Sequence, residues 1–398
     1  MNAYEEAERA LRAAPPHGLL DAIRTVLKRH YGARSVELLL ADYSLTVLLP
    51  VSGLAHTPES LSIDNSLPGR VFGAQEPGRE EREDATVVHL PVTVRGDRLG
   101  VLSVVLPTDA HSSAIRAELL DIAEMLAHAV IVAERDTDIY LRARRKDRLT
   151  LAAEMQWQLL PGRACSRDEY AIGAQLEPAY AVHGDNFDWS ATADHLVLTV
   201  TNGMGEGIDA ALLTNLTINA LRNARRAGIS IADQAALADQ AVFAQHRGDA
   251  YLSVLLLDFE LSTGRVRVVD AGSPRLLLLR EGTVSAVDFD AQLPLGMFEE
   301  TDYTSQEFQL RPGDRLVFVS DGVHAVASPA GEAYGERALA RAINATRLLP
   351  AAEMPRALLR ELTGHRGRPD PDDDALVVCL DWHGRPTTHP PAEDPANP

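Results

Sequence analysis

Cysteine is scarce in this sequence. The chain has 398 residues and two cysteines, Cys165 and Cys379, which stand far apart. Cys379 lies in an apolar run typical of a strand. A disulfide framework is therefore not expected, and a reduced compartment fits this usage.

Positive charge is also in short supply. Lysine and arginine number 38 against 57 aspartates and glutamates, which gives a formal net charge of -19. This balance argues against nucleic acid or an anionic membrane surface as a partner, and it favours solubility and cation binding. An ordinary acidic cytosolic protein has the same balance, so charge alone selects no specific partner.

Long apolar runs are absent. No run approaches the length of a membrane span, and the first ten residues, MNAYEEAERA, lack the apolar core of a signal peptide. We therefore expect a cytoplasmic protein with no membrane partner.

Proline and glycine are absent from residues 115–160. Within this stretch Leu119, Ile122 and Leu126 begin a heptad-like spacing whose phase shifts further on. We predict one or two long helices that link two domains, with a short coiled coil as one form of the link. The charge run from Glu134 to Arg148 is typical of a solvated helix surface, and it would also suit pairing between chains.

The first part of the chain predicts a small α+β domain. Residues 4–29 are typical of helices broken at Pro15-Pro16, and short strands are expected over 36–41 and 45–51. Residues 52–84 are polar and loop-rich. A clearer hairpin follows, with strands over 87–94 and 98–106 joined at Gly96-Asp97.

Two phrases in this part, LPGRVFG at 67–73 and LPVTVRGDRLGVLSVVL at 90–106, resemble the GAF family of regulatory domains over about residues 10–135. The resemblance implies a sensing module that is often dimeric, so we expect a homodimer formed through this domain and the linking helix. Its histidines (His56, His89 and His111) are scattered and define no ligand site. Packing or dimerisation explains the domain as well as ligand sensing does.

From about Tyr170 the pattern becomes rich in strands. Ten strands are predicted, over 172–176, 187–191, 196–200, 251–259, 266–270, 276–279, 284–287, 305–310, 315–319 and 375–381. Four helices are predicted, over 206–227, 231–246, 336–347 and 352–363. This order favours an antiparallel sandwich covered by helices. The proline-rich tail after Trp382 is typical of disorder.

Acidic residues stand at the edges of the expected strands. Asp185 precedes one strand, Asp321 follows another, and the run 372–374 precedes a third. Carboxylates that meet at one end of a sheet suit hard divalent cations, and two such ions can clamp a phosphoryl displacement. Each residue alone is more often structural, because Asp-Gly is a common turn and aspartate runs are often solvated.

The stretch from His195 to Leu213 follows the same logic. It is typical of a buried strand, a loop with Gly203, Gly205 and Gly207, and then a helix. A backbone approaches a phosphate or a metal closely in such loops, although most glycine loops at strand ends are turns.

Taken in order, the motifs of residues 150–382 resemble the metal-dependent protein phosphatase (PPM, protein phosphatase 2C-like) family, in its stage II sporulation protein E-like branch. The matching segments are QLLP at 158–161, GDNFD at 184–188, NGMGEG at 202–207, DAGSP at 270–274, LPLG at 293–296, SDGV at 320–323 and DD at 372–373. The resemblance implies an α-β-β-α sandwich and a serine/threonine phosphoprotein phosphatase that uses two Mn²⁺ or Mg²⁺ ions.

The resemblance also assigns the site. Asp185, Asp321 and Asp372 would be catalytic metal ligands together with Gly203, and Asn202, Glu206, Asp188 and Asp373 would modify the site. Such enzymes often act on anti-anti-sigma factors, with a sensor domain that controls the phosphatase through a connecting helix. The whole chain then divides into a GAF-like domain (1–114), a helical linker (115–160), a phosphatase domain (161–384) and a disordered tail (385–398).

The sequence departs from the family pattern in the glycine loop. Asn202 replaces the aspartate that bridges both metals, and Glu206 and Ser273 replace histidines. His183 replaces the first glycine of its motif. An amide oxygen brings no negative charge and is a poor bridge between two dications. Two alternatives therefore stay open: a catalytically degenerate binding or scaffold protein of this fold, and a single-metal hydrolase of a small phosphoester.

Overall fold

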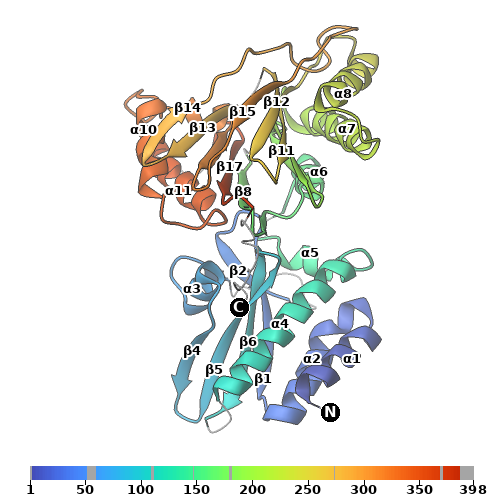
Figure 1. Ribbon diagram of the computed structural model, residues 1–398. Coiled ribbons are helices and arrows are strands. Elements are labelled where there is room, and N and C mark those ends of the chain that lie inside the picture. Colours follow the sequence, from blue (N-terminus) through green and yellow to red (C-terminus); the bar gives the residue numbers. More distant parts are fainter. Residues whose placement is uncertain are drawn as a thin grey trace, which may run out of the picture. The chain divides into compact units, whose positions relative to one another are not determined.

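The computed structural model describes residues 2–51, 60–108, 112–146, 148–178, 182–272, 274–367 and 371–385. Ser273, part of the loop expected at 52–84 and most of the predicted tail lie outside these residues. The chain forms two compact units that meet in sequence after Thr150. Each unit is described by itself (Figure 1).

The N-terminal unit is one six-stranded antiparallel sheet with helices. Its strands lie in the order β3-β2-β1-β6-β5-β4. The strands are β1 (Ser35–Ala41), β2 (Val47–Pro50), β3 (Leu61–Ser62), β4 (Gly78–Arg82), β5 (Ala85–Val94) and β6 (Asp97–Pro107). The helices are α1 (Ala3–Ala13), α2 (Leu19–Tyr31), α3 (Leu67–Ala74), α4 (Ser113–Ala133) and α5 (Ile139–Ala143), with a 3₁₀ turn at Pro16–Gly18. The helix break at Pro15-Pro16 and the β5–β6 hairpin are as predicted.

Two apolar cores cover the two faces of this sheet. On β1, Leu38 and Leu40 belong to the core that includes α2 and α4, whereas Leu39 belongs to a second core with Phe72 of α3. This division follows from the period of a strand, in which successive side chains point to opposite faces.

The predicted helical linker over 115–160 is corrected by the structure. α4 ends at Ala133, and its apolar positions Leu119, Ile122 and Leu126 are fully buried in the core of the N-terminal unit. The heptad-like spacing arises because this face of α4 packs on its own sheet, so these residues are not available for a coiled coil. After the short helix α5, the next helix is α6 (Leu151–Leu159), which belongs to the second unit.

The C-terminal unit contains two antiparallel sheets. The five-stranded sheet has the order β15-β12-β11-β10-β9 and the six-stranded sheet the order β14-β13-β16-β17-β8-β7. The strands are β7 (Ala164–Ser166), β8 (Tyr170–Glu177), β9 (Asn186–Ala191), β10 (His195–Asn202), β11 (Ser253–Glu260), β12 (Arg265–Ala271), β13 (Arg275–Arg280), β14 (Thr283–Ala286), β15 (Gln306–Gln309), β16 (Arg315–Val319) and β17 (Ala375–Trp382). The helices, besides α6, are α7 (Gly207–Arg226), α8 (Ile231–His246), α9 (Asp321–His324), α10 (Glu336–Ala345) and α11 (Met354–Arg366).

Helices cover the outer faces of this sandwich (Figure 1). Leu213 of α7 and Val242 of α8 share a core with Val254 of β11. On the other sheet, Leu358 of α11 shares a core with Val377 of β17. The predicted antiparallel sandwich with helices on both sides is therefore confirmed. The sequence patterns do not predict β7 and α9, which are the shortest strand and helix described in this unit.

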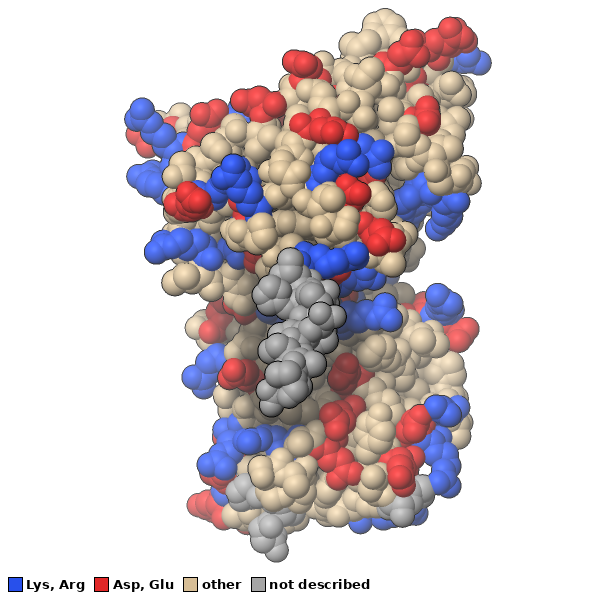
Figure 2. All heavy atoms as spheres, viewed as in Figure 1, with Lys and Arg blue, Asp and Glu red and all other residues tan. Residues whose placement is uncertain are grey.

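The surface carries charges of both signs (Figure 2), and both cysteines are buried. On the visible face of each unit, acidic and basic side chains are mixed (Figure 2). Cys165 and Cys379 are both buried and free. Within the described ranges, no helix combines the length and the apolar character that crossing a bilayer requires.

An ion-pair network joins β9 to α7. The Asp188 side chain is 4% exposed, and its two carboxylate oxygens lie 2.8 Å from Arg222 and 2.8 Å from Arg225. Arg222 also donates to the carbonyl oxygen of Leu159 at the end of α6 (2.7 Å). One guanidinium thus holds a strand and two helices together.

This network predicts different costs for two arginines of the same helix. We expect Arg222→Met to lower the free energy of unfolding of the C-terminal unit by about 2 kcal/mol, because it leaves buried acceptors short of a charged donor. Arg226→Met is the matched control, since Arg226 is exposed on α7, and its effect should stay within about 0.5 kcal/mol. Urea unfolding followed by fluorescence measures both, and equal costs would contradict the network.

Candidate active site

The strand register brings the predicted acidic residues to one end of the sandwich. Asp185 precedes β9, whose first residue pairs with Thr201 near the end of β10. Asp321 follows β16, and Val319 at the end of β16 pairs with Val377 near the start of β17. In antiparallel pairs, the end of one strand lies beside the start of the next. The sequence segments of the site are therefore neighbours in space.

A buried carboxylate fastens the two sheets together at this end. Asp374 is fully buried, and its Oδ2 accepts hydrogen bonds from the backbone amides of His183 (3.0 Å), Gly184 (2.9 Å) and Asp185 (3.3 Å). The Gln156 side chain of α6 donates to the same oxygen (2.8 Å) and to the backbone oxygen of Asp185 (2.9 Å). Four donors on one oxygen offset the cost of burying a negative charge. Sequence analysis did not assign a role to Asp374.

Asp185 is the most constrained carboxylate of the group. It is 1% exposed. Its Oδ1 accepts from the Gly203 amide (3.1 Å), whereas its Oδ2 is buried without a hydrogen-bond partner. Burial raises the pKa of Asp185 well above its ordinary value, and the neighbouring charges of Asp374 and, to a smaller extent, Asp321 raise it further. The Ser320 side chain and the Gly203 amide lower this pKa without cancelling the rise. Crowded carboxylates with an unpaired buried oxygen are the arrangement that a cation would relieve.

Asp321 and Asp373 complete the acidic cluster. Asp321 begins α9, and its Oδ1 accepts from the amide of Gly322 (2.9 Å). Oδ1 of Asp373 lies 2.8 Å from Nδ1 of His183. Burial raises the pKa of Asp373, and the charge of Asp321 raises it further. Asp372 itself is exposed, so the two aspartates after it make the inward contacts described here. Its assignment as a metal ligand stays a prediction.

The glycine loop approaches the cluster through its backbone. A side chain at Gly203 would place its Cβ 2.0 Å from the carbonyl oxygen of His183, so only glycine fits there. Asn202, the last residue of β10, is half-buried, and Glu206 is exposed at the N-terminus of α7. Among the contacts of the described residues, none joins Glu206 to Asp185, so its expected rescue of the missing carboxylate stays a prediction.

Asp188 lies outside this cluster. Its carboxylate is held by Arg222 and Arg225 on the α7 side of β9. The expectation that Asp188 modifies the metal site is therefore corrected: its carboxylate is engaged in the ion pairs that fix β9 to α7.

The donor chemistry of the cluster fits a hard cation. The side chains that converge are carboxylates, and Oδ2 of Asp185 lacks a partner. Asp185 and Asp321 are the residues that would hold an ion. Across the described ranges, however, no three histidine, cysteine or acidic side chains are placed to bind one ion jointly. The cluster therefore contains ligands of the right chemical type, but the described side chains do not form a complete coordination shell.

A solved structure identifies the class of fold. The C-terminal part of the chain is similar to the SiaA-PP2C domain of Pseudomonas aeruginosa, with a TM-score of 0.50 and 22% identity over 58% of this chain and 94% of that chain. The C-terminal unit therefore has a PP2C-like mixed α+β fold.

The family can then be stated. Residues 192–383 match the family described as Stage II sporulation protein E (SpoIIE), and we conclude that this part of the C-terminal unit is a SpoIIE-type PP2C domain. This confirms the resemblance found in the sequence motifs of this unit.

Two curated proteins are similar to part of this chain. Phosphoserine phosphatase RsbU of Bacillus subtilis is 22% identical over 200 residues, which are 50% of this chain and 60% of that protein. Protein IcfG of Synechocystis is 20% identical over 255 residues, which are 57% of this chain and 40% of that protein. The matches therefore leave a large share of both relatives unaligned.

The raised pKa of Asp185 predicts a stabilising substitution. A carboxyl whose pKa is raised in the folded state is penalised once the pH exceeds its unfolded pKa, near 3.8, and the penalty grows until the pH passes the folded value. We expect Asp185→Asn to raise the melting temperature of the metal-free protein at pH 7, with a gain that shrinks as the pH falls towards 4.

Differential scanning calorimetry in the presence of a chelator measures this effect. Asp302→Asn is the matched control, because Asp302 is exposed and should show no such gain. Added Mn²⁺ should raise the melting temperature of the wild type and not that of Asp185→Asn. A lower melting temperature for metal-free Asp185→Asn at pH 7 would contradict the repulsion described here.

Proposed function

We propose that the C-terminal unit is a metal-dependent phosphatase that removes phosphate from phosphoserine or phosphothreonine in a protein, using Mn²⁺ or Mg²⁺. The observation that carries the proposal is the unpaired, buried Oδ2 of Asp185 beside the charges of Asp374 and Asp321, within a domain of this family. A divalent cation at such a site supplies Lewis-acid polarisation of a phosphoryl group.

The residues of the chain then have separate tasks. Asp185 and Asp321 would hold the ion, with Asp372 and the Gly203 backbone as further ligands. Asp374 keeps the loop before β9 against the start of β17 through its hydrogen bonds, so it acts as a positioning residue. The contact between Oδ1 of Asp373 and Nδ1 of His183 (2.8 Å) would hold the Asp373 carboxylate in place. None of these tasks requires a nucleophilic side chain.

The substrate and the regulation extend the proposal. The name of the RsbU relative gives a phosphoserine phosphatase, which supports a phosphoprotein substrate. We propose an anti-anti-sigma factor as that substrate, the class that the family resemblance implies. The N-terminal unit would act as a GAF-like sensor and dimerisation module in the cytoplasm. Its six-stranded sheet with helices supports this role.

Gln156 offers a route for that regulation. It lies on α6, the first helix after the boundary at Thr150, and it donates directly to Asp374 and to the backbone of Asp185. A change in the position of α6 would therefore alter the hydrogen bonds that support the acidic cluster.

Two observations favour a second function. Asn202 stands where the family has a bridging aspartate, and the described carboxylates do not form a complete ligand set. A phosphatase fold that binds a phosphoprotein without turnover is the alternative that these two facts support.

Phosphate release from a phosphoserine peptide with added Mn²⁺ separates the two functions. We expect the wild-type full chain to turn over the peptide and Asp321→Asn to lower kcat/KM by about 100-fold, because a ligand charge is lost at nearly constant volume. Asp302→Asn, a change of the same chemistry at an exposed position, should leave the rate unchanged. Turnover of p-nitrophenyl phosphate without turnover of any peptide would instead indicate a hydrolase of small phosphoesters.

The unusual amide predicts a gain on substitution. We expect Asn202→Asp to tighten Mn²⁺ binding by about tenfold and to raise turnover, because each added ligand charge strengthens binding of a hard dication. Calorimetric titration and the peptide assay measure the two effects. Weaker binding in Asn202→Asp would mean that the chain is adapted to the amide, and turnover absent from both proteins would support the binding function.

A further inference from the structure

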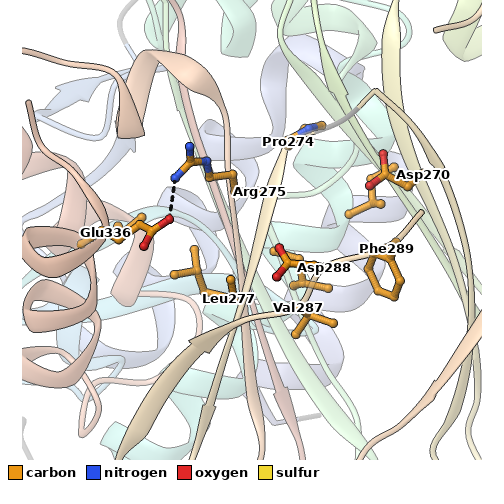
Figure 3. A pocket seen from close by; sticks show the side chains of 12 residues that line it. Asp270, Pro274, Arg275, Leu277, Val287, Asp288, Phe289 and Glu336 are labelled. Carbon is orange, nitrogen blue, oxygen red and sulfur yellow. Dashed lines mark hydrogen bonds and ion pairs between the residues drawn. The ribbon is translucent and has the colours of Figure 1, made fainter. Parts of the chain in front are cut away.

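The C-terminal unit contains a cavity of about 290 Å³. It is bounded by β11 and β12 of one sheet and by β13, the segment after β14 and α10 on the other side (Figure 3). We call it the flanking cavity. Its lining residues include Leu255, Asp270, Arg275, Asp288, Phe289 and Glu336.

The strand register places this cavity at the catalytic end of the sandwich. Arg275 at the start of β13 pairs with Val319, two residues before Asp321. Burial lowers the pKa of the half-buried His324 of α9. The charge of Arg275 lowers this pKa further and that of Asp321 raises it, so His324 lies near both side chains. β12 is two strands from β10, which corresponds to about 10 Å at the usual strand spacing.

The cavity has an apolar wall. Leu255, Leu276 and Leu339 are all buried, and Phe289 packs against Phe308 of β15 with ring centroids 5.8 Å apart. Such a wall suits the methylene stem of a long side chain.

The rim of the cavity is held in place by hydrogen bonds. The backbone amide of Val287 donates to the backbone carbonyl oxygen of Leu276 (2.9 Å). The backbone amide of Gln292 donates to the backbone carbonyl oxygen of Asp270 (2.8 Å). The Gln292 side chain also forms two bonds with the Thr304 backbone, 2.9 Å and 2.7 Å. A fixed rim lowers the entropy cost of binding.

Negative charge dominates the opening. Figure 3 shows the carboxylates of Asp270, Asp288 and Glu336 around it, with Arg275 joined to Glu336 at 3.4 Å. The lining thus carries three carboxylates and one guanidinium, and Asp288 is exposed at the rim. An apolar wall under an acidic rim is complementary to an alkyl chain that ends in a cation.

We propose that the flanking cavity receives a lysine or arginine side chain of the phosphoprotein substrate. The cavity is bounded by β12, which lies three strands from β9 beside Asp185, and by β13, which is the neighbour of β16 beside Asp321. At the usual strand spacing these separations are about 14 Å and about 5 Å. An extended peptide advances about 3.3 Å per residue, so this range corresponds to roughly two to four residues, and a spacing of three residues is the one to test. The inference rests on the proposed function and adds a sequence preference to it: a basic residue at a fixed spacing from the phosphoserine.

Fluorescence anisotropy with the full chain tests the proposal. The probes are labelled peptides that contain a non-hydrolysable phosphoserine analogue, with either lysine or norleucine three residues before or after it. We expect one of the two lysine peptides to bind about threefold to fivefold more tightly than its norleucine partner, as for partly exposed ion pairs. Asp288→Lys should abolish or reverse this preference.

Glu299→Lys is the matched control, because Glu299 is exposed and does not line the cavity; the preference for lysine should persist in it. The proposal is overturned if wild type shows no preference, or if the preference survives Asp288→Lys. Where binding is too weak for anisotropy, methyl NMR signals of Leu255, Leu276 and Leu339 are followed during titration with the same peptides. Signals that do not move with the lysine peptide overturn the proposal.

The test separates this inference from the proposed function. Lysine preference without phosphate release from the hydrolysable peptide would mean that the cavity assignment holds and the catalytic proposal fails. If the lysine and norleucine peptides instead bind equally and release phosphate equally, the catalytic proposal holds and the cavity assignment fails.

Discussion

The arrangement of the acidic cluster depends on the buried carboxylate of Asp374. Its Oδ2 takes four hydrogen bonds, three from successive backbone amides at residues 183–185 and one from Gln156. The three backbone bonds attach the loop before β9 of the five-stranded sheet to the residue that precedes β17 of the six-stranded sheet. A buried carboxylate is tolerated only where several hydrogen-bond donors surround it, as they do here. Loss of the charge would free the loop that carries Asp185.

The same packing creates a conflict that defines the site. One carboxylate oxygen of Asp185 accepts a hydrogen bond from the Gly203 amide. The other has no hydrogen-bond partner, and the carboxylate lies near the charges of Asp374 and Asp321. Such a position costs stability in the metal-free protein, a common feature of functional sites. The glycine at 203 and the glycine at 322 permit the close backbone approach, because a Cβ at either position would lie 2.0 Å from a carbonyl oxygen.

Much of the fold follows from sequence patterns, and the exceptions have physical causes. Alternation and turn residues predicted the β5–β6 hairpin, and periodicity predicted α8 with its bounds. The apolar spacing of α4 was assigned to a linker because a core-facing helix and a coiled coil share nearly the same period. In the run 372–374, the family resemblance implies Asp372 as the ligand, whereas the contacts described above come from Asp373 and Asp374. Which aspartate of a run points inward depends on the loop backbone, which local patterns do not determine.

The central claim is that these carboxylates are held together to bind a divalent cation. The most direct test is the anomalous diffraction of Mn²⁺ in crystals of the full chain. We predict a strong anomalous peak next to Oδ2 of Asp185 and near the carboxylate of Asp321. The peak should be absent from crystals of Asp185→Asn. Crystals saturated with Mn²⁺ that show no peak at Asp185 would contradict the account, and Asp185 would then be a structural carboxylate of a domain that only binds its partner.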